Sequence, residues 1–169
     1  MNAEFWAQFL AQLFATALGS AGALGTYLWL QRRDQRERRN IIKLENLQQI
    51  YEASLKLRHA IEQSETAVEQ LVDSALENTA HELPDFSAII QQYSRLSMLV
   101  RLNGPELSAN DAAVDDGLSD YFTGASFEVI RASNTGEPDR VQISELRLAA
   151  ENHVRRLTEA TEGAHQGLA

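Results

Sequence analysis

The stretch "LFATALGSAGALGTYLWLQRRDQRERR", residues 13 to 39, places a long apolar segment directly before a cluster of arginines. No charged side chain occurs from Phe5 to Gln31. A helix of that length would reach roughly 40 Å, which exceeds the roughly 30 Å hydrocarbon core of a bilayer. We therefore expect residues 5–30 to form a single transmembrane helix, preceded by a short extracytoplasmic N-terminus at 1–4.

Two other interpretations of this stretch remain open. A cleaved signal peptide would carry positive charge before its apolar region, whereas here the arginines follow it, although Ala21-Gly22-Ala23 resembles a cleavage site. A buried helix of a soluble domain would need to be covered on all sides by a chain of only 169 residues. It would also leave unexplained the aromatic residues at the two ends, which in a bilayer would form interfacial belts: Phe5, Trp6, Tyr27 and Trp29.

The basic segment at residues 31–43 predicts the orientation of the chain. By the positive-inside rule its arginines lie on the cytoplasmic side, so the N-terminus is expected outside the inner (plasma) membrane and the C-terminal domain in the cytoplasm. Asp34 and Glu37 interrupt the cluster, which favours a topology signal with weak attraction to anionic lipid over a specific lipid site. The arginines concerned are Arg32, Arg33, Arg36, Arg38 and Arg39.

One face of the expected span combines polar and small residues. Small side chains let helix backbones approach closely, and polar groups form hydrogen bonds between helices in lipid. We expect this face to pack against another membrane protein or a second copy, although alanine and glycine are also common in spans that pack against nothing. The face consists of Gln8, Gln12, Ala15, Thr16, Gly19, Ser20 and Ala23.

The rest of the chain is expected to be all-α. Aromatic residues make up only 7% of the sequence, and neither glycine nor proline occurs between Gly25 and Pro84, so nothing forces the first helix to end at the membrane. Short breaks divide the remainder into further apolar helical stripes. These features predict a cytosolic antiparallel bundle of about four helices over residues 44–163, continuous with the span, and a flexible tail at 164–169.

The apolar stripes and the breaks between them predict the individual helices. Leu83-Pro84-Asp85 is expected to start the second helix, with proline in its first turn, and Asn103-Gly104-Pro105 to end it with a left-handed glycine. Ser108 with Asp111 is expected to cap a third helix, which Thr123-Gly124 could divide in two. The expected apolar seams are Leu47, Ile50, Ser54, Leu57, Ile61, Ser64, Val68, Leu71 and Ala75; Phe86, Ile89, Tyr93, Leu96 and Val100; Val114, Leu118, Phe122, Val129 and Ile130; and Ile143, Leu146, Ala150, His153, Leu157 and Ala160.

Charge divides the chain sharply and restricts its partners. Residues up to Lys43 carry a net charge of +3, while the rest carries −12, within a total of −9. An acidic domain of this kind repels phosphate backbones, so nucleic acid is not expected as a partner. The run "NDAAVDDGLSD" lacks calcium-loop spacing, and we interpret its acidic residues as a solvated face or a docking patch for a cytosolic protein: Asp111, Asp115, Asp116 and Asp120.

No pattern in the sequence indicates catalytic chemistry. The chain has no cysteine, and its four histidines do not show metal-ligand spacing within stable helices. His153 lies on an apolar seam and is expected to be a boundary histidine rather than a pH-sensitive core group. There is no glycine-rich phosphate loop or nucleophile motif, so we expect no enzyme activity, cofactor or metal site.

These observations favour a membrane-anchored interaction module, an accessory subunit or scaffold that holds a cytosolic partner at the membrane. The alternative is a homo-oligomeric membrane sensor or gate, in which the polar face of the span forms a seam between copies.

Overall fold

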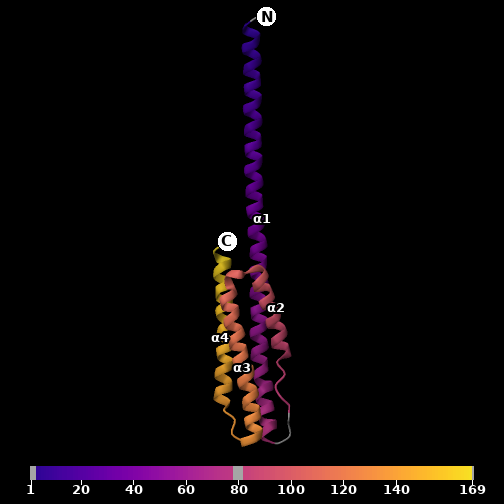
Figure 1. Cartoon of the computed structure of the whole chain (residues 1–169), viewed down its shortest axis with the longest axis vertical. Coiled ribbons are helices and arrows are strands. Elements are labelled where there is room, and N and C mark those ends of the chain that lie inside the picture. Colours follow the sequence, from indigo (N-terminus) through magenta and orange to yellow (C-terminus); the bar gives the residue numbers. More distant parts are fainter. Residues whose placement is uncertain (1–2, 78–81, 169) are drawn as a thin grey trace. The chain divides into compact units, whose positions relative to one another are not determined.

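The computed structural model describes the backbone of residues 3–77 and 82–168 and the side chains of residues 24–77 and 82–168. Within this part of the chain there are helices but no strands, so the expected all-α bundle is confirmed (Figure 1). The chain divides into two compact units, Met1–Ile42 and Lys43–Ala169. The elements are α1 (Ala3–Leu76), α2 (Ser87–Asn103), the short 3-10 helix η1 (Pro105–Leu107), α3 (Ser108–Thr135) and α4 (Arg140–Gln166).

The second unit is an antiparallel helical bundle. The part of α1 from Lys43 onward lies beside α2, α3 and α4, and the chain reverses direction at each connection (Figure 1). Polar pairs between α1 and α4 record this direction, because residue numbers fall along α4 as they rise along α1: Ser54 with Thr158, Glu65 with Arg147, and Asp73 with Arg140. The connections that lead into α3 and α4 are short and leave no chain for a crossover, which favours this arrangement.

The expected seam on α1 forms the centre of the bundle. Its 3-4 spacing places the apolar side chains on one face, and each large aliphatic side chain buried there contributes about 1.5–3 kcal/mol. Seven of the nine expected positions are buried, whereas Ser64 and Leu71 are partly buried. The buried positions are Leu47, Ile50, Ser54, Leu57, Ile61, Val68 and Ala75.

The start of α2 differs from the sequence prediction. Pro84 lies outside the helix, which begins at Ser87, so its expected place in the first turn was wrong. Asp85 instead accepts a hydrogen bond from the Ser87 backbone N–H at 2.8 Å. The nearby side chain of Phe86 stacks on Phe122 of α3, with ring centroids 4.4 Å apart, and this contact fixes where the connecting segment meets the bundle.

The turn between α2 and α3 requires glycine for space rather than for handedness. Gly104 has φ −140° and ψ 56°, so the expected left-handed conformation was wrong. A Cβ atom at this position would lie 2.9 Å from Ile50 Cδ1 of α1 and 3.3 Å from Leu107 Cδ1. The absence of a side chain therefore lets the turn close over the end of the core.

The third helix is continuous from Ser108 to Thr135. The expected division at Thr123-Gly124 was wrong, and so was the Ser108–Asp111 cap, because the N-cap is Leu107 and has no side-chain cap bond. Ile130 also departs from the expected seam and is exposed. α3 is held as one helix by its buried neighbours in the bundle, which outweigh the low helix propensity of its two internal glycines.

At those two glycines α3 and α4 pack closely together. A Cβ atom on Gly117 would lie 2.9 Å from His153 Cδ2 and 3.4 Å from the Ala150 Cα atom, and one on Gly124 would collide with Leu146 Cδ1. The contacts repeat with opposite residue order, which again indicates antiparallel packing. The free-energy cost of placing glycine inside a helix is thus offset by the close packing of α3 against α4.

Candidate functional site

The N-terminal unit presents aromatic and basic residues together. Tyr27 and Trp29 are exposed, and the Arg33 guanidinium lies 5.9 Å from the centre of the Trp29 ring. Arg33 also donates a hydrogen bond to Glu37 at 2.9 Å, and this bond raises the pKa of the guanidinium above its usual value. Glu37, which interrupts the arginine cluster, therefore pairs with one member of that cluster.

The side chains of the expected packing face lie outside the described residues, and so do those of Phe5 and Trp6. That face comprises Gln8, Gln12, Ala15, Thr16, Gly19, Ser20 and Ala23. Over the residues whose side chains are described, no helix is long and apolar enough to cross a membrane.

The acidic residues of α3 divide into two environments. Asp115, Asp116 and Asp120 are exposed on the outward side of the helix, as expected for a docking patch or a solvated face. Asp111 is buried, with 5% of its surface exposed, and its Oδ2 atom accepts a hydrogen bond from Ser97 of α2 at 2.9 Å. Asp111 therefore belongs to the contact between α2 and α3 and not to an exposed patch.

Tyr93 completes this contact between α2 and α3. Its hydroxyl donates to the backbone oxygen of Asp111 at 3.4 Å. Burial, followed by the charge of Asp111, raises the pKa of Tyr93 to about 12. Asp111 Oδ1 is buried without a hydrogen-bond partner among the described residues, so the contact retains an unsatisfied acceptor.

A shallow groove of about 470 Å³ lies between α2 and α3 beside this contact. Most of its lining residues belong to α2, and α3 contributes Asp115: Tyr93, Ser94, Ser97, Met98, Arg101, Leu102 and Asp115. Sequence reasoning assigned no role to Met98, Arg101 or Leu102. Met98 and Leu102 lie off the apolar seam of α2, and this position could have indicated an exposed binding surface, because large apolar residues on the outer face of a helix have no partner in the bundle.

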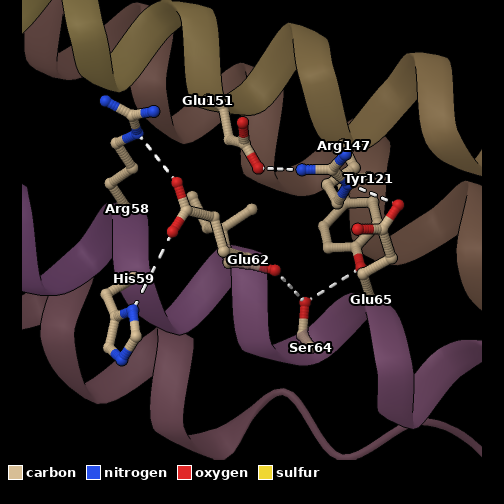
Figure 2. A network of polar contacts seen from close by, with 9 residues as sticks. Arg58, His59, Glu62, Ser64, Glu65, Tyr121, Arg147 and Glu151 are labelled. Atoms are coloured by element: carbon tan, nitrogen blue, oxygen red, sulfur yellow. Dashed lines mark hydrogen bonds and ion pairs between the residues drawn. The ribbon is translucent and has the colours of Figure 1, made fainter.

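A charged network joins α1 to α4 in the middle of the bundle. Figure 2 shows Arg147 of α4 between Glu65 of α1 and Glu151 of α4. Arg147 Nε lies 3.0 Å from Glu65 Oε1, at ion-pair distance but without hydrogen-bond alignment, and another guanidinium nitrogen donates to Glu151. Arg147 and Glu151 are largely buried, with side chains 14% and 13% exposed, so their charges depend on each other for stabilisation.

A neutral hydrogen bond beside this network connects α1 to α3. The hydroxyls of Ser64 and Tyr121 are 2.9 Å apart, and Ser64 also donates to the Ile61 backbone oxygen at 2.7 Å (Figure 2). Tyr121 is fully buried, and this burial raises the pKa of its phenol. The serine on the α1 seam therefore provides a polar partner for a buried tyrosine that sequence reasoning did not place in the core.

The described histidines occupy the margins of the bundle. His153 is half-buried against Gly117, as expected for a boundary residue. His59 is exposed and lies 2.8 Å from Gln63, and His165 lines a groove of about 410 Å³ between α1 and the end of α4. His81 lies outside the described residues. Within the described part of the chain, no three histidine, aspartate or glutamate side chains are grouped to hold a metal ion.

No protein-family model, no curated protein and no solved structure matches the chain. Function is therefore inferred from the residues themselves.

Proposed function

We propose that this protein is a single-pass membrane-anchored interaction module, which acts as an accessory subunit or scaffold and holds a cytosolic partner at the membrane. The observation that carries the proposal is the uncharged stretch from Phe5 to Gln31, followed immediately by five arginines within residues 32–39. Such a stretch has the length and flanking charge of a membrane span. Residues 5–30 are the proposed anchor, with the N-terminus outside and the bundle in the cytoplasm of the cell.

The form of the bundle supports a binding role. Arg147, Glu65 and Glu151 use their charges to join α1 to α4, and exposed apolar residues remain on the outer surfaces of the bundle, including Leu55 on α1 and Leu148 on α4. Exposed apolar residues beside charged ones are typical of protein-binding surfaces. A module of this kind acts through what it binds and where it is held.

Membrane extraction tests the anchor. The full-length chain is expected to stay in the membrane fraction after alkaline carbonate washing, and Leu18→Arg should release it, because an arginine at the centre of a span costs about 2.5–3.5 kcal/mol. Ala149→Arg, at an exposed position on α4, is the matched control and should remain in the membrane. Release of the unmodified chain by carbonate would refute the anchor.

Cysteine labelling tests the orientation. The chain has no cysteine, so Asn2→Cys and Lys56→Cys, the latter at an exposed position on α1, each introduce a single reactive thiol. A membrane-impermeant maleimide applied to intact cells should label the first variant and not the second. The reverse pattern would contradict the proposed topology.

Purification after cross-linking in intact membranes tests the role as an accessory subunit. A foreign protein in stoichiometric amount is the expected result. An assembly that contains only this chain, and that changes the conductance of reconstituted bilayers, would favour the sensor or gate instead.

A further inference from the structure

The outer face of α2 has a charge opposite to that of the domain around it. α2 contains Arg95 and Arg101 and no acidic residue, whereas the chain from residue 44 onward carries a net charge of −12. Both arginines are exposed, and neither forms an ion pair with a described residue. Five other arginines of the bundle do form such pairs: Arg58, Arg131, Arg140, Arg147 and Arg155.

The same face of α2 exposes three large apolar side chains. Ile90, Met98 and Leu102 follow one another at multiples of four residues, which places them on one side of a helix. They are 51%, 54% and 71% exposed, although α2 buries its opposite side in the core. This face therefore combines apolar side chains with unpaired positive charge.

The adjoining outer face of α3 has the complementary composition. Asp115, Asp116 and Asp120 are exposed and form no ion pair with a described residue, and Phe127 and Ile130 are exposed farther along the helix. The groove of about 470 Å³ connects the two faces, since Arg101 and Asp115 both line it. We call the two faces together the α2–α3 surface; it consists of Ile90, Arg95, Met98, Arg101, Leu102, Asp115, Asp116, Asp120, Phe127 and Ile130.

We propose that the α2–α3 surface binds a second copy of this chain, with α2 of each copy against α3 of the other. In a pair related by a two-fold axis, α2 of the first copy contacts α3 of the second, and α2 of the second contacts α3 of the first. The arginines of each copy then lie opposite the aspartates of the other. The apolar side chains beside them lose contact with water at the same time. Charge complementarity of this kind selects the partner and its register.

Charge also distinguishes this occupant from others. Anionic lipid would be attracted to Arg95 and Arg101 but repelled by Asp115 and Asp116 beside them. A foreign protein would need both an acidic and a basic patch in matching order, and a second copy carries both. The inference concerns residues 43–169 and holds whether or not residues 5–30 span a membrane.

Charge reversal in the full-length chain tests the pairing. The variant R95E/R101E makes both faces acidic, and the variant D115K/D116K/D120K makes both basic. Each variant alone should lose self-association by at least about tenfold, because like charges face each other. An equal mixture of the two, differently tagged, should recover association and form mixed pairs in preference to like pairs. The control is K56E/R156E, which reverses two exposed cations that form no ion pair with a described residue and should associate as the unmodified chain does.

Mass by light scattering in mild detergent and co-purification of the two tags are the readouts. Self-association that persists in either variant, or a mixture that does not recover pairing, would overturn the proposal. An unmodified chain that is monomeric, whether alone, with a foreign protein or on anionic vesicles, would overturn it equally. Such results leave the membrane anchor untouched, since carbonate extraction tests the anchor separately.

Cysteine cross-linking provides a second measurement that needs no charge reversal. Ser94→Cys on α2 and Ser119→Cys on α3 replace small exposed residues within the two faces. Chains with one substitution should be linked to chains with the other by a short bis-maleimide, and Lys56→Cys should not be linked to either. Equal linking of the Lys56→Cys control would contradict the proposed interface.

Discussion

Replacing Arg147 with methionine tests whether the charged network stabilises the bundle. Arg147 and Arg155 lie on the same helix, and each pairs with a glutamate four residues later. The two pairs differ in environment, since the Arg147 and Glu151 side chains are 14% and 13% exposed, whereas those of Arg155 and Glu159 are 59% and 62% exposed. The two substitutions therefore compare a largely buried pair with an exposed one.

The structure allows the size of each effect to be worked out. Arg147→Met leaves Glu151 largely buried without its partner, and it also removes the ion pair with Glu65 on α1. Loss of one partner from a buried pair costs about 3–5 kcal/mol, and partial exposure of Glu65 places the expected loss near the lower value, about 3 kcal/mol. Arg155→Met removes an exposed pair and should cost less than about 0.5 kcal/mol.

Urea unfolding followed by far-ultraviolet circular dichroism, on the full-length chain in non-ionic detergent, measures both free energies of unfolding. A triple variant, Glu65→Gln with Arg147→Met and Glu151→Leu, should recover most of the loss, because it leaves no buried charge without a partner. If Arg147→Met costs no more than Arg155→Met, the network does not stabilise the bundle. If the triple variant is no more stable than Arg147→Met, the loss does not come from the unpaired glutamate.

Three further predictions concern the bundle. Glu128 is fully buried and accepts a hydrogen bond from the Asp139 backbone N–H at 2.6 Å. Glu128→Ala should therefore lower the free energy of unfolding by about 1–3 kcal/mol, whereas Glu128→Gln, which keeps an acceptor, should lower it by less. Equal losses for the two variants in urea unfolding would contradict this role. Gly117→Leu should destabilise the bundle by about 1–3 kcal/mol because α4 occupies the space, whereas Gly163→Leu, with nothing within 4 Å, should leave thermal stability equal or higher. The folded state holds the Tyr93 phenol proton more tightly than the unfolded chain does, because its pKa is raised to about 12. The contribution of this proton to stability is therefore complete below pH 10 and is lost as the pH rises toward 12. Between these pH values the free energy of unfolding should fall more steeply for the unmodified chain than for Tyr93→Phe.

The helical seams were accessible from sequence because burial on a helix has a regular period. Leu47, Ile61 and Val68 on α1 and Leu96 on α2 are buried as the spacing indicated. Local rules were less successful at the helix ends. Pro84, Gly104 and Ser108 carry strong end signals, but the surrounding bundle decided where each helix begins and how each turn is closed.

The candidate surfaces were predictable only in part. The exposed aspartates of α3 were identified from their clustering, yet Asp111 belongs to the same cluster and is buried against Ser97. Sequence spacing did not reveal that difference, because it depends on how close α2 lies to α3. The outer face of α2 was missed for a related reason: an apolar residue such as Met98 is recognised as unpartnered only when the position of every neighbouring helix is known.

The sequence by itself determined the helical class, the main seams, the division of charge, and the expectation of a membrane anchor before an acidic bundle. These properties follow from composition and periodicity, which act locally along the chain. Tertiary structure alone decided that Glu128 accepts a hydrogen bond from the backbone N–H at the start of α4, that Gly117 lies against α4, and that Arg147 joins α4 to α1. Each of those roles depends on contacts between residues far apart in sequence, and such contacts are set by the packing of whole helices.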